Sequence, residues 1–396
     1  MVQRIGLLTL PLETNYGGIL QAVSLYQYLT AAGKEVVFLE THPPESRRRR
    51  AVLDALAHVP FLPSLTRLLA KRPEGARGPL ARSLSSGLLA RLRANAEIVL
   101  FERKAALHLP FRHRFITRRS GPLSSSQALA DAVERFKLDA LVVGSDQVWR
   151  LDYLPPDLRE DFFFRFAPDP AVRKVSYAAS FGRGEWLFPE AGPAIAALLA
   201  RFHAVSVREA SGVTICADVL GRGDARHVLD PTMLIDTSFF DTASAPPLGR
   251  TGKTLLSYVL DEEPDRPFVS REVHAALGEG YTVRSLTLDD GKAAVDVPGW
   301  LRAYMDADFV VTDSYHGTVF SILFQKNFIA ILNRSRGADR FVSLLGQLGL
   351  SDRLVMDPTP ETLHALARTP VDFAPVAARL KELRAQSAAF LHEALA

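Results

Sequence analysis

The chain has 396 residues, of which 47% are hydrophobic and 23% charged, and a formal net charge of +3. This length is more than one hydrophobic core usually supports, so we expect two domains. The single cysteine, Cys216, excludes an internal disulfide and suits a reducing compartment. The first residues predict a strand and not a signal peptide, and no apolar run approaches the roughly 20 residues of a spanning helix. We therefore expect a cytoplasmic protein.

The positive charge is concentrated in one segment. Residues 43–120 contain 17 Lys and Arg against 5 Asp and Glu, a net charge of +12, whereas the remainder carries −9. Four consecutive arginines occupy positions 47–50. The leucines that share one predicted helical face are Leu80, Leu84, Leu88, Leu89 and Leu92. We interpret this segment as a basic helical insertion in the first domain.

The first domain otherwise alternates strands and helices, which is typical of a parallel α/β sheet. Strands are predicted at residues 4–10, 35–40, 139–143, 174–179 and 203–207, followed by residues 228–229. The first helix, residues 18–32, ends at Gly33. Its start carries Asn15, Tyr16, Gly17 and Gly18. Glycines let the backbone approach a ligand closely, and a helix start binds anions, so we predict a substrate-binding loop here.

Polar residues follow two other predicted strands of this domain. Ser145, Asp146 and Gln147 come directly after residues 139–143, and Arg208 comes directly after residues 203–207. Open α/β sheets bind their ligands at the carboxyl ends of strands. An arginine fork suits phosphate or carboxylate, whereas Asp146 and Gln147 suit sugar hydroxyls or a turn cap. We predict that Arg208 faces the cleft between the domains.

A second alternation follows residues 236–252, which contain Ala, Pro, Gly and small polar residues and which we interpret as an interdomain linker. Strands are predicted at residues 254–260, 281–286, 309–312 and 328–332, and helices at 267–277, 298–305, 317–324 and 376–395. The predicted units are therefore residues 1–236, residues 253–375 and a final helix over residues 376–396.

The organising stretch of the chain is residues 307–332. Asp313 and Ser314, both N-cap residue types, stand between a predicted strand and a predicted helix. His316 falls at the turn, where the free N–H groups of a helix start bind anions. We predict His316 to be catalytic, with Ser314, Gly317 and Thr318 around the substrate.

Several basic residues follow this helix. Lys326 is predicted at the sheet end opposite His316. Arg334, Arg336 and Arg340 follow the strand that ends at Leu332, so they should emerge at the same edge as His316. We predict Arg336 and Arg340 to be substrate ligands. The sequence contains no metal-ligand pattern such as CxxC or HExxH.

Residues 313–321, DSYHGTVFS, resemble the signature near the C-terminal end of the polysaccharide pyruvyl transferase family. The segments TNYGG, GSDQVW, SYAASFG, SVRE and VLDPT are similar to other family segments, in the family order. The resemblance implies two Rossmann-like domains in a GT-B-like fold, with the final helix packing back on the first domain.

The resemblance also implies an activity. These enzymes move the enolpyruvyl carbons of phosphoenolpyruvate onto two hydroxyls of a saccharide, forming a pyruvate ketal in cell-surface polysaccharide biosynthesis. It implies phosphoenolpyruvate as donor substrate, no other cofactor, and an acceptor often carried on a lipid. His316 would act as acid or phosphate ligand, Arg208 and Arg336 as anion clamps, and Asp146 within the catalytic group. Two alternatives remain open: a GT-B glycosyltransferase using a nucleotide sugar, and a non-catalytic saccharide-binding protein.

One position departs from the family pattern. Some members carry an arginine two positions before the motif histidine, where this chain has Ser314. If that arginine clamps the donor, its task falls here to another group such as Arg336 or Arg340. The basic segment at residues 43–120 suggests peripheral contact with the inner face of the membrane. It lacks interleaved aromatic residues, so we expect no nucleic-acid partner.

Overall fold

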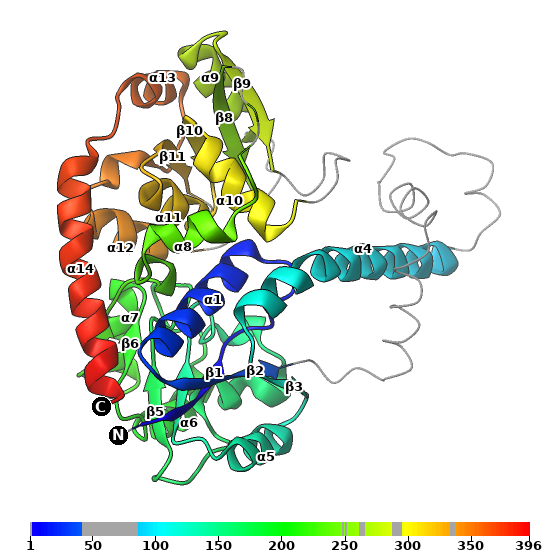
Figure 1. Cartoon of the computed structure of the whole chain (residues 1–396), viewed down its shortest axis with the longest axis vertical. Coiled ribbons are helices and arrows are strands. Elements are labelled where there is room, and N and C mark those ends of the chain that lie inside the picture. Colours follow the sequence, from blue (N-terminus) through cyan, green and yellow to red (C-terminus); the bar gives the residue numbers. More distant parts are fainter. Residues whose placement is uncertain are drawn as a thin grey trace.

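The computed structural model describes residues 2–41, 86–247, 249, 252–260, 266–286, 295–332 and 337–396, without the side chains of residues 86–100, 266 and 267. Two five-stranded sheets dominate it, one in each half of the chain (Figure 1). Every strand pair in both sheets is parallel. The predicted α/β class with two Rossmann-like domains is confirmed.

The first sheet has the order β3-β2-β1-β4-β5. Its strands are β1 (Arg4–Leu8), β2 (Glu35–Thr41), β3 (Arg119–Leu123), β4 (Ala140–Val143) and β5 (Arg173–Ser176). The chain leaves β1 in one direction for β2 and returns on its other side as β4. The order therefore reverses between β1 and β4, and ligands bind beside such a switch point.

The second sheet has the order β12-β11-β10-β8-β9, with its own switch point between β8 and β10. Its strands are β8 (Lys253–Tyr258), β9 (Tyr281–Ser285), β10 (Phe309–Thr312), β11 (Asn327–Ile331) and β12 (Leu354–Val355). Its helices are α9 (Arg266–Leu277), α10 (Val297–Asp306), α11 (Tyr315–Leu323), α12 (Asp339–Gln347) and α13 (Pro360–Arg368). The strand and helix predicted around His316 are both present, with the helix beginning two residues earlier than predicted.

Helices and short elements complete the first half. The helices are α1 (Tyr16–Ala31), α4 (Ser86–Phe115), α5 (Ser126–Phe136), α6 (Gly192–Leu199) and α7 (Ala210–Thr214), continued by a π-helical turn (Ile215–Val219). Short 3-10 helices occur at Leu151–Tyr153, Pro156–Phe163, Pro189–Ala191 and Pro231–Met233, and in the second half at Ser351–Arg353. The strand predicted at residues 203–207 is only the two-residue β6 (Ser206–Val207), which pairs with β7 (Arg226–His227). Before it, the chain meets β5 through a single bridge at Ala204 and forms no ladder.

The predicted linker contains a helix, α8 (Thr237–Ala243). Asp236 caps it by accepting a hydrogen bond from the backbone N–H of Ser238. Phe240 is fully buried and its ring meets that of Phe320 in α11, 4.9 Å between centroids. The small polar residues around α8 made this helix hard to predict, because only two of its seven residues, Phe240 and Ala243, are buried.

The helical insertion is described from Ser86 onward. There α4 extends 30 residues and projects from the body of the molecule (Figure 1). Its C-terminal end returns to the core, where Phe111 and Phe115 are buried and Arg112 lies 3.7 Å from Glu40. The sheet resumes with β3 at Arg119, just inside the predicted insertion boundary. The four arginines and the side chains of the leucine face lie outside the described part.

The last helix, α14 (Phe373–Ala394), runs along the molecule from the second half to the first (Figure 1). Phe390 and Leu391 are buried, and the Phe390 ring lies 6.4 Å from that of Tyr177. Ser387 Oγ accepts a hydrogen bond from the backbone N–H of Leu229 at 3.0 Å. Both contacts join α14 to the first half. Among the described residues, no helix has the length and hydropathy that crossing a bilayer requires.

Candidate functional site

Two helix N-termini from the two halves meet at the switch points. The first, α1, follows β1, and the second, α11, follows β10. Ser314 caps α11 by accepting a hydrogen bond from the backbone N–H of Gly317 at 3.2 Å. A Cβ atom on Gly17 would overlap the imidazole of His316, so the start of α1 lies directly on that ring. Two positive helix ends therefore converge on His316, which favours an anionic ligand.

Asp230 stands at the centre of this site and is fully buried. Its Oδ2 accepts hydrogen bonds from Arg208 Nη1 at 2.8 Å and Ser145 Oγ at 3.1 Å, and lies 3.4 Å from His316 Nε2. Its Oδ1 accepts a hydrogen bond from Thr232 Oγ1 at 2.8 Å. Burial raises the pKa of Asp230, but His316 and Arg208 outweigh it and hold that pKa well below the ordinary value. The carboxylate therefore stays charged and orients both partners.

The contact between His316 and Asp230 has the distance of an ion pair without the alignment of a hydrogen bond. His316 is only 6% exposed. An imidazole held against a buried carboxylate has a fixed position, which a general acid requires.

Two guanidinium groups share the ring of Tyr315. Arg208 Cζ lies 4.4 Å from the ring centroid and Arg340 Cζ 5.6 Å. Burial, together with the charge of Arg208, lowers the pKa of Arg340 to about 10. Arg208 is completely buried, and its Nε and Nη2 atoms have no hydrogen-bond partner within the described residues. Unsatisfied buried guanidinium donors are costly, and an anion with several oxygens would satisfy them.

Glu209 fixes the neighbouring turn. Its Oε1 accepts a hydrogen bond from Ser180 Oγ at 2.9 Å. It also accepts hydrogen bonds from the backbone N–H groups of Phe181 at 2.8 Å and Gly182 at 3.2 Å. Burial raises the pKa of Glu209, although Arg208 opposes this. A Cβ atom on Gly337 would overlap the carbonyl of Gly182, so this turn lies directly against the segment that leads into α12. Glu209 thereby helps to place Arg340, near the start of that helix.

Asp146 adopts a left-handed backbone, with φ of 74°. Such strain in a residue other than glycine is often found at functional sites. Its Oδ1 accepts a hydrogen bond from the backbone N–H of Gln147 and lies 3.6 Å from Arg208 Nη2. Asn15 Nδ2 donates to Asp146 Oδ2 at 3.4 Å, and Asn15 is exposed at the outer end of the site. Gln147 uses its Oε1 to accept a hydrogen bond from Arg150, at 3.1 Å.

Other predicted residues have structural contacts. Tyr16 stacks on Trp300 of the second half, 5.6 Å between centroids, and burial together with Asp296 raises its pKa to about 12. Thr318 Oγ1 donates to the carbonyl of Ser314.

The other predicted positions do not share one set of contacts. Gly18 donates its backbone N–H to Asn15 Oδ1, as part of the N-cap of α1, and Gly317 leaves no room for a Cβ beside Thr312. Lys326 donates to the carbonyl of Met305, at the sheet end away from His316. Arg336 lies outside the described residues.

Three residues of the site were not predicted: Asp230, Tyr315 and Glu209. Asp230 follows β7 and so obeys the rule that singled out Asp146, but its segment was used only for the family resemblance. Tyr315 lies inside the signature, and its aromatic face carries no sequence signal of a cation partner. Glu209 follows Arg208 in the segment SVRE, which was used only for the family resemblance.

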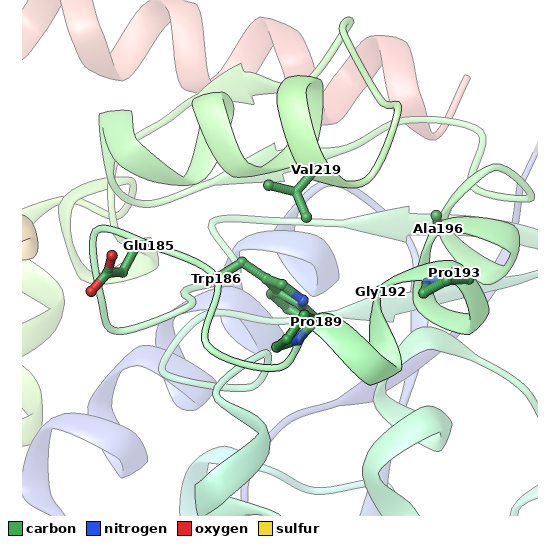
Figure 2. A pocket seen from close by; sticks show the side chains of 7 residues that line it. All are labelled: Glu185, Trp186, Pro189, Gly192, Pro193, Ala196 and Val219. Atoms are coloured by element: carbon green, nitrogen blue, oxygen red, sulfur yellow. The ribbon is translucent and has the colours of Figure 1, made fainter.

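One described hollow is lined by residues other than those of this site. Figure 2 shows it on the first half, with a volume of about 540 Å³. It is lined by Glu185, Trp186, Pro189, Gly192, Pro193, Ala196 and Val219. Glu185 is the only charged residue in this lining, so the hollow does not suit an anionic ligand. Within the described residues, no three His, Cys, Asp or Glu side chains are placed to hold a metal ion.

The sequence matches a family model over most of its length. A family model for polysaccharide pyruvyl transferases matches residues 15–335, which include His316, Asp230 and Arg208. The chain belongs to this family. No curated protein matches the sequence.

The solved structures that resemble this member of the polysaccharide pyruvyl transferase family have low sequence identity to it. A Streptomyces glycosyltransferase is 14% identical with a TM-score of 0.40, covering 98% of this chain and 96% of its own. UDP-GlcNAc 2-epimerase from Neisseria meningitidis bound to UDP-GlcNAc is 9% identical, with a TM-score of 0.44 and coverage of 99% and 100%. UDP-N-acetylglucosamine 2-epimerase from Rickettsia bellii is 8% identical, with a TM-score of 0.48 and coverage of 100% and 97%.

Proposed function

We propose that this protein transfers the pyruvyl group of phosphoenolpyruvate to two hydroxyls of a saccharide, forming a pyruvate ketal in cell-surface polysaccharide biosynthesis. The observation that supports it is the pair of buried guanidiniums, Arg208 and Arg340, beside His316 in a chain of this family. Phosphoenolpyruvate carries a phosphate and a carboxylate, and an arginine fork suits either group. Phosphoenolpyruvate is thus the donor substrate, and the proposal requires no separate cofactor.

In this proposal His316 donates a proton to the methylene carbon of phosphoenolpyruvate. The neighbouring carbon becomes oxocarbenium-like, and a sugar hydroxyl attacks it. The carbon–oxygen bond to phosphate then breaks, and a second hydroxyl closes the ketal. Of the two hydroxyl protons, one restores His316 and the other leaves with phosphate. A positioned acid contributes on the order of 10²–10⁴-fold, and Asp230 holds the imidazole for this step.

The serine at position 314 is consistent with this assignment. Ser314 caps α11, so it stabilises the helix end that carries His316. Arg340 reaches the same place from α12 and would take over the arginine's task of clamping the donor. Arg336 is proposed as a further anion ligand on its position in the sequence.

A donor screen tests the function. The protein is incubated with either phosphoenolpyruvate or a set of sugar nucleotides and with a pool of nitrophenyl and lipid-linked sugars. We expect acceptor-dependent release of phosphate from phosphoenolpyruvate and a product heavier by the pyruvyl group. Release of nucleoside diphosphate instead would favour a glycosyltransferase, and saccharide binding without either release would favour a non-catalytic binding protein.

His316→Ala is the matched variant for this screen. Loss of the positioned acid should lower turnover by roughly a hundredfold or more. The melting temperature should fall only modestly, because the buried imidazole is lost but Arg208 and Ser145 still donate hydrogen bonds to Asp230. Near-normal turnover of this variant would remove His316 from the mechanism.

A further inference from the structure

A second cluster of polar and aromatic side chains lies beside the site. Its members, the Tyr153 patch, are Arg150, Asp152, Tyr153 and Arg183. Tyr153 is 46% exposed, and Arg150 Cζ lies 3.9 Å from its ring centroid. Arg150 is itself buried and donates hydrogen bonds from Nε and Nη2 to the carboxylate of Asp152, at 3.1 to 3.3 Å. A buried cation therefore holds an exposed aromatic ring in a fixed orientation.

The Tyr153 patch is continuous with the site around Asp230. Arg150 Nη1 donates to Oε1 of Gln147, which follows Asp146 in the chain. A Cβ atom on Gly182 would overlap that same Oε1, so the turn that Glu209 fixes lies on Gln147. The next residue of the turn is Arg183. One residue, Gln147, thus separates the proposed donor site from the patch.

The chemistry of the patch matches a sugar ring. Asp152 and Arg183 have side chains 38% and 41% exposed, and their charged groups lie 3.8 Å apart. The Nε atom of Arg183 has no hydrogen-bond partner within the described residues. A pyranose has one apolar face and a rim of neighbouring hydroxyls. The Tyr153 ring offers a surface for the face, and the planar ionic groups suit pairs of hydroxyls.

An exposed tyrosine alone is ordinary on a protein surface. This one differs because it stacks on a buried arginine whose partner, Asp152, belongs to a partly exposed ion pair, and because Gln147 alone separates it from the proposed donor site. The hollow in Figure 2 has an aromatic lining residue too, but Trp186 donates its Nε1–H to the carbonyl of Phe188. Its other lining residues offer few hydrogen bonds to hydroxyls.

We propose that the Tyr153 patch binds the second sugar unit of the acceptor, next to the unit that receives the pyruvyl group. This inference rests on the proposed function, because it names the place where the rest of the proposed acceptor binds. It makes the acceptor an oligosaccharide or glycan end and not a free monosaccharide.

The test measures saccharide binding without donor. Saturation-transfer NMR titrations use nitrophenyl glycosides of glucose, galactose, mannose and N-acetylglucosamine, together with a disaccharide ending in each. For at least one sugar, the disaccharide should bind about tenfold more tightly than its monosaccharide. Tyr153→Ala should abolish that difference, and Tyr153→Phe should keep it because the ring remains. Phe101→Ala, which removes an exposed aromatic ring that lies outside the Tyr153 patch in α4, should leave this saccharide binding in solution unchanged.

Three outcomes overturn the proposal: no disaccharide of the panel binds better than its monosaccharide, Tyr153→Ala keeps the difference, or only Trp186→Ala removes it. The last result would place the acceptor in the hollow of Figure 2.

Failure of the proposed function would show separately. In that case the unmodified protein would release no phosphate from phosphoenolpyruvate with any acceptor. In turnover assays, Tyr153→Ala should raise KM for the disaccharide about tenfold while kcat and the KM for phosphoenolpyruvate stay unchanged.

Discussion

Among single residues, Gly17 is a point of close contact between the two halves of the site. A Cβ atom there would overlap His316, and the neighbours are the rigid start of α1 and the imidazole. Gly17→Ala should therefore displace His316 and lower turnover at least tenfold, since a misplacement near 1 Å at a catalytic group is costly. A steady-state assay of phosphate release measures this.

Gly346→Ala is the matched control for that variant. Gly346 lies in α12, and a Cβ atom there would meet only Ser351, at 4.0 Å. The change should leave turnover unchanged and stabilise the helix by up to about 1 kcal/mol. Full activity of Gly17→Ala would show that His316 has room to move.

Asp230 should make stability depend on pH. Removing its charge leaves Arg208 buried without its closest partner, so Asp230→Asn should lower the free energy of unfolding at pH 7 by about 3–5 kcal/mol. The folded-state pKa of Asp230 lies below the unfolded value of about 3.9. Its contribution is therefore fully present above about pH 4 and is lost as the pH falls through the folded pKa.

Denaturant titrations between pH 3 and pH 7 measure that effect. The difference between the unmodified protein and Asp230→Asn should shrink below about pH 4. Asp224→Asn, at a carboxylate 67% exposed and paired with Arg222, should change stability by less than about 1 kcal/mol. A difference for Asp230→Asn that stays constant over this range would contradict the depressed pKa.

Part of the site could be predicted from the sequence, because that part follows from local rules. His316, Arg208 and Asp146 each follow a strand, and the carboxyl ends of parallel strands meet at one edge. The contacts that make them one site could not be predicted. Asp230 joins residues 208 and 316, and Tyr315 joins residues 208 and 340, so both contacts depend on how the two halves meet.

At the scale of elements, prediction succeeded where burial was strong and local. The strand β10 has four fully buried apolar or small residues, and its predicted bounds are those observed. Prediction failed for α8, which has only two buried residues, and for β6, where only two residues pair. The long α4 has apolar residues along its whole length, so its sequence predicted a helix without showing that Phe111 and Phe115 at its C-terminal end return to the core.

The last helix, α14, offers a prediction at this scale. Ser387 is 2% exposed, and its Oγ accepts a hydrogen bond from the backbone N–H of Leu229, directly before Asp230. Ser387→Ala leaves that buried N–H unpaired and should lower the free energy of unfolding by about 1–3 kcal/mol. Chemical denaturation measures it. The exposed neighbour Gln386→Ala should change stability little, and equal values for the two variants would show that α14 does not hold this segment.

At the scale of the whole molecule, the site belongs to neither half alone. Arg208 and Asp230 come from the first half, and His316 and Arg340 from the second. Tyr16 on Trp300 and the α14 contacts hold the halves together around it. The site therefore requires a fixed relation between the two sheets, and a change at the contact between the halves should reach the chemistry.

The charge of the molecule is distributed unevenly along the chain. Residues 43–120 carry a net +12, whereas the rest carries −9. Within this segment, α4 projects from the body and exposes Phe101, Leu107 and Leu109 (Figure 1). The acceptor, if carried on a lipid, lies at an anionic membrane surface. We propose that this segment brings the protein to the inner face of the membrane as a peripheral protein.

Sedimentation with liposomes tests that proposal. Each Lys or Arg near an anionic surface contributes roughly 1 kcal/mol, and the attraction fades within a Debye length, about 10 Å at 0.1 M salt. The protein should sediment with anionic and not with neutral liposomes, and less so at high salt. Changing the four arginines at positions 47–50 to serine should weaken binding strongly.

The control is a variant with the same net charge, in which four exposed arginines outside the basic segment become serine: Arg226, Arg271, Arg368 and Arg379. This control should bind as the unmodified protein does. Equal recovery of all three proteins in the supernatant under every condition would end the proposal, and equal weakening by both variants would assign the attraction to net charge and not to this segment.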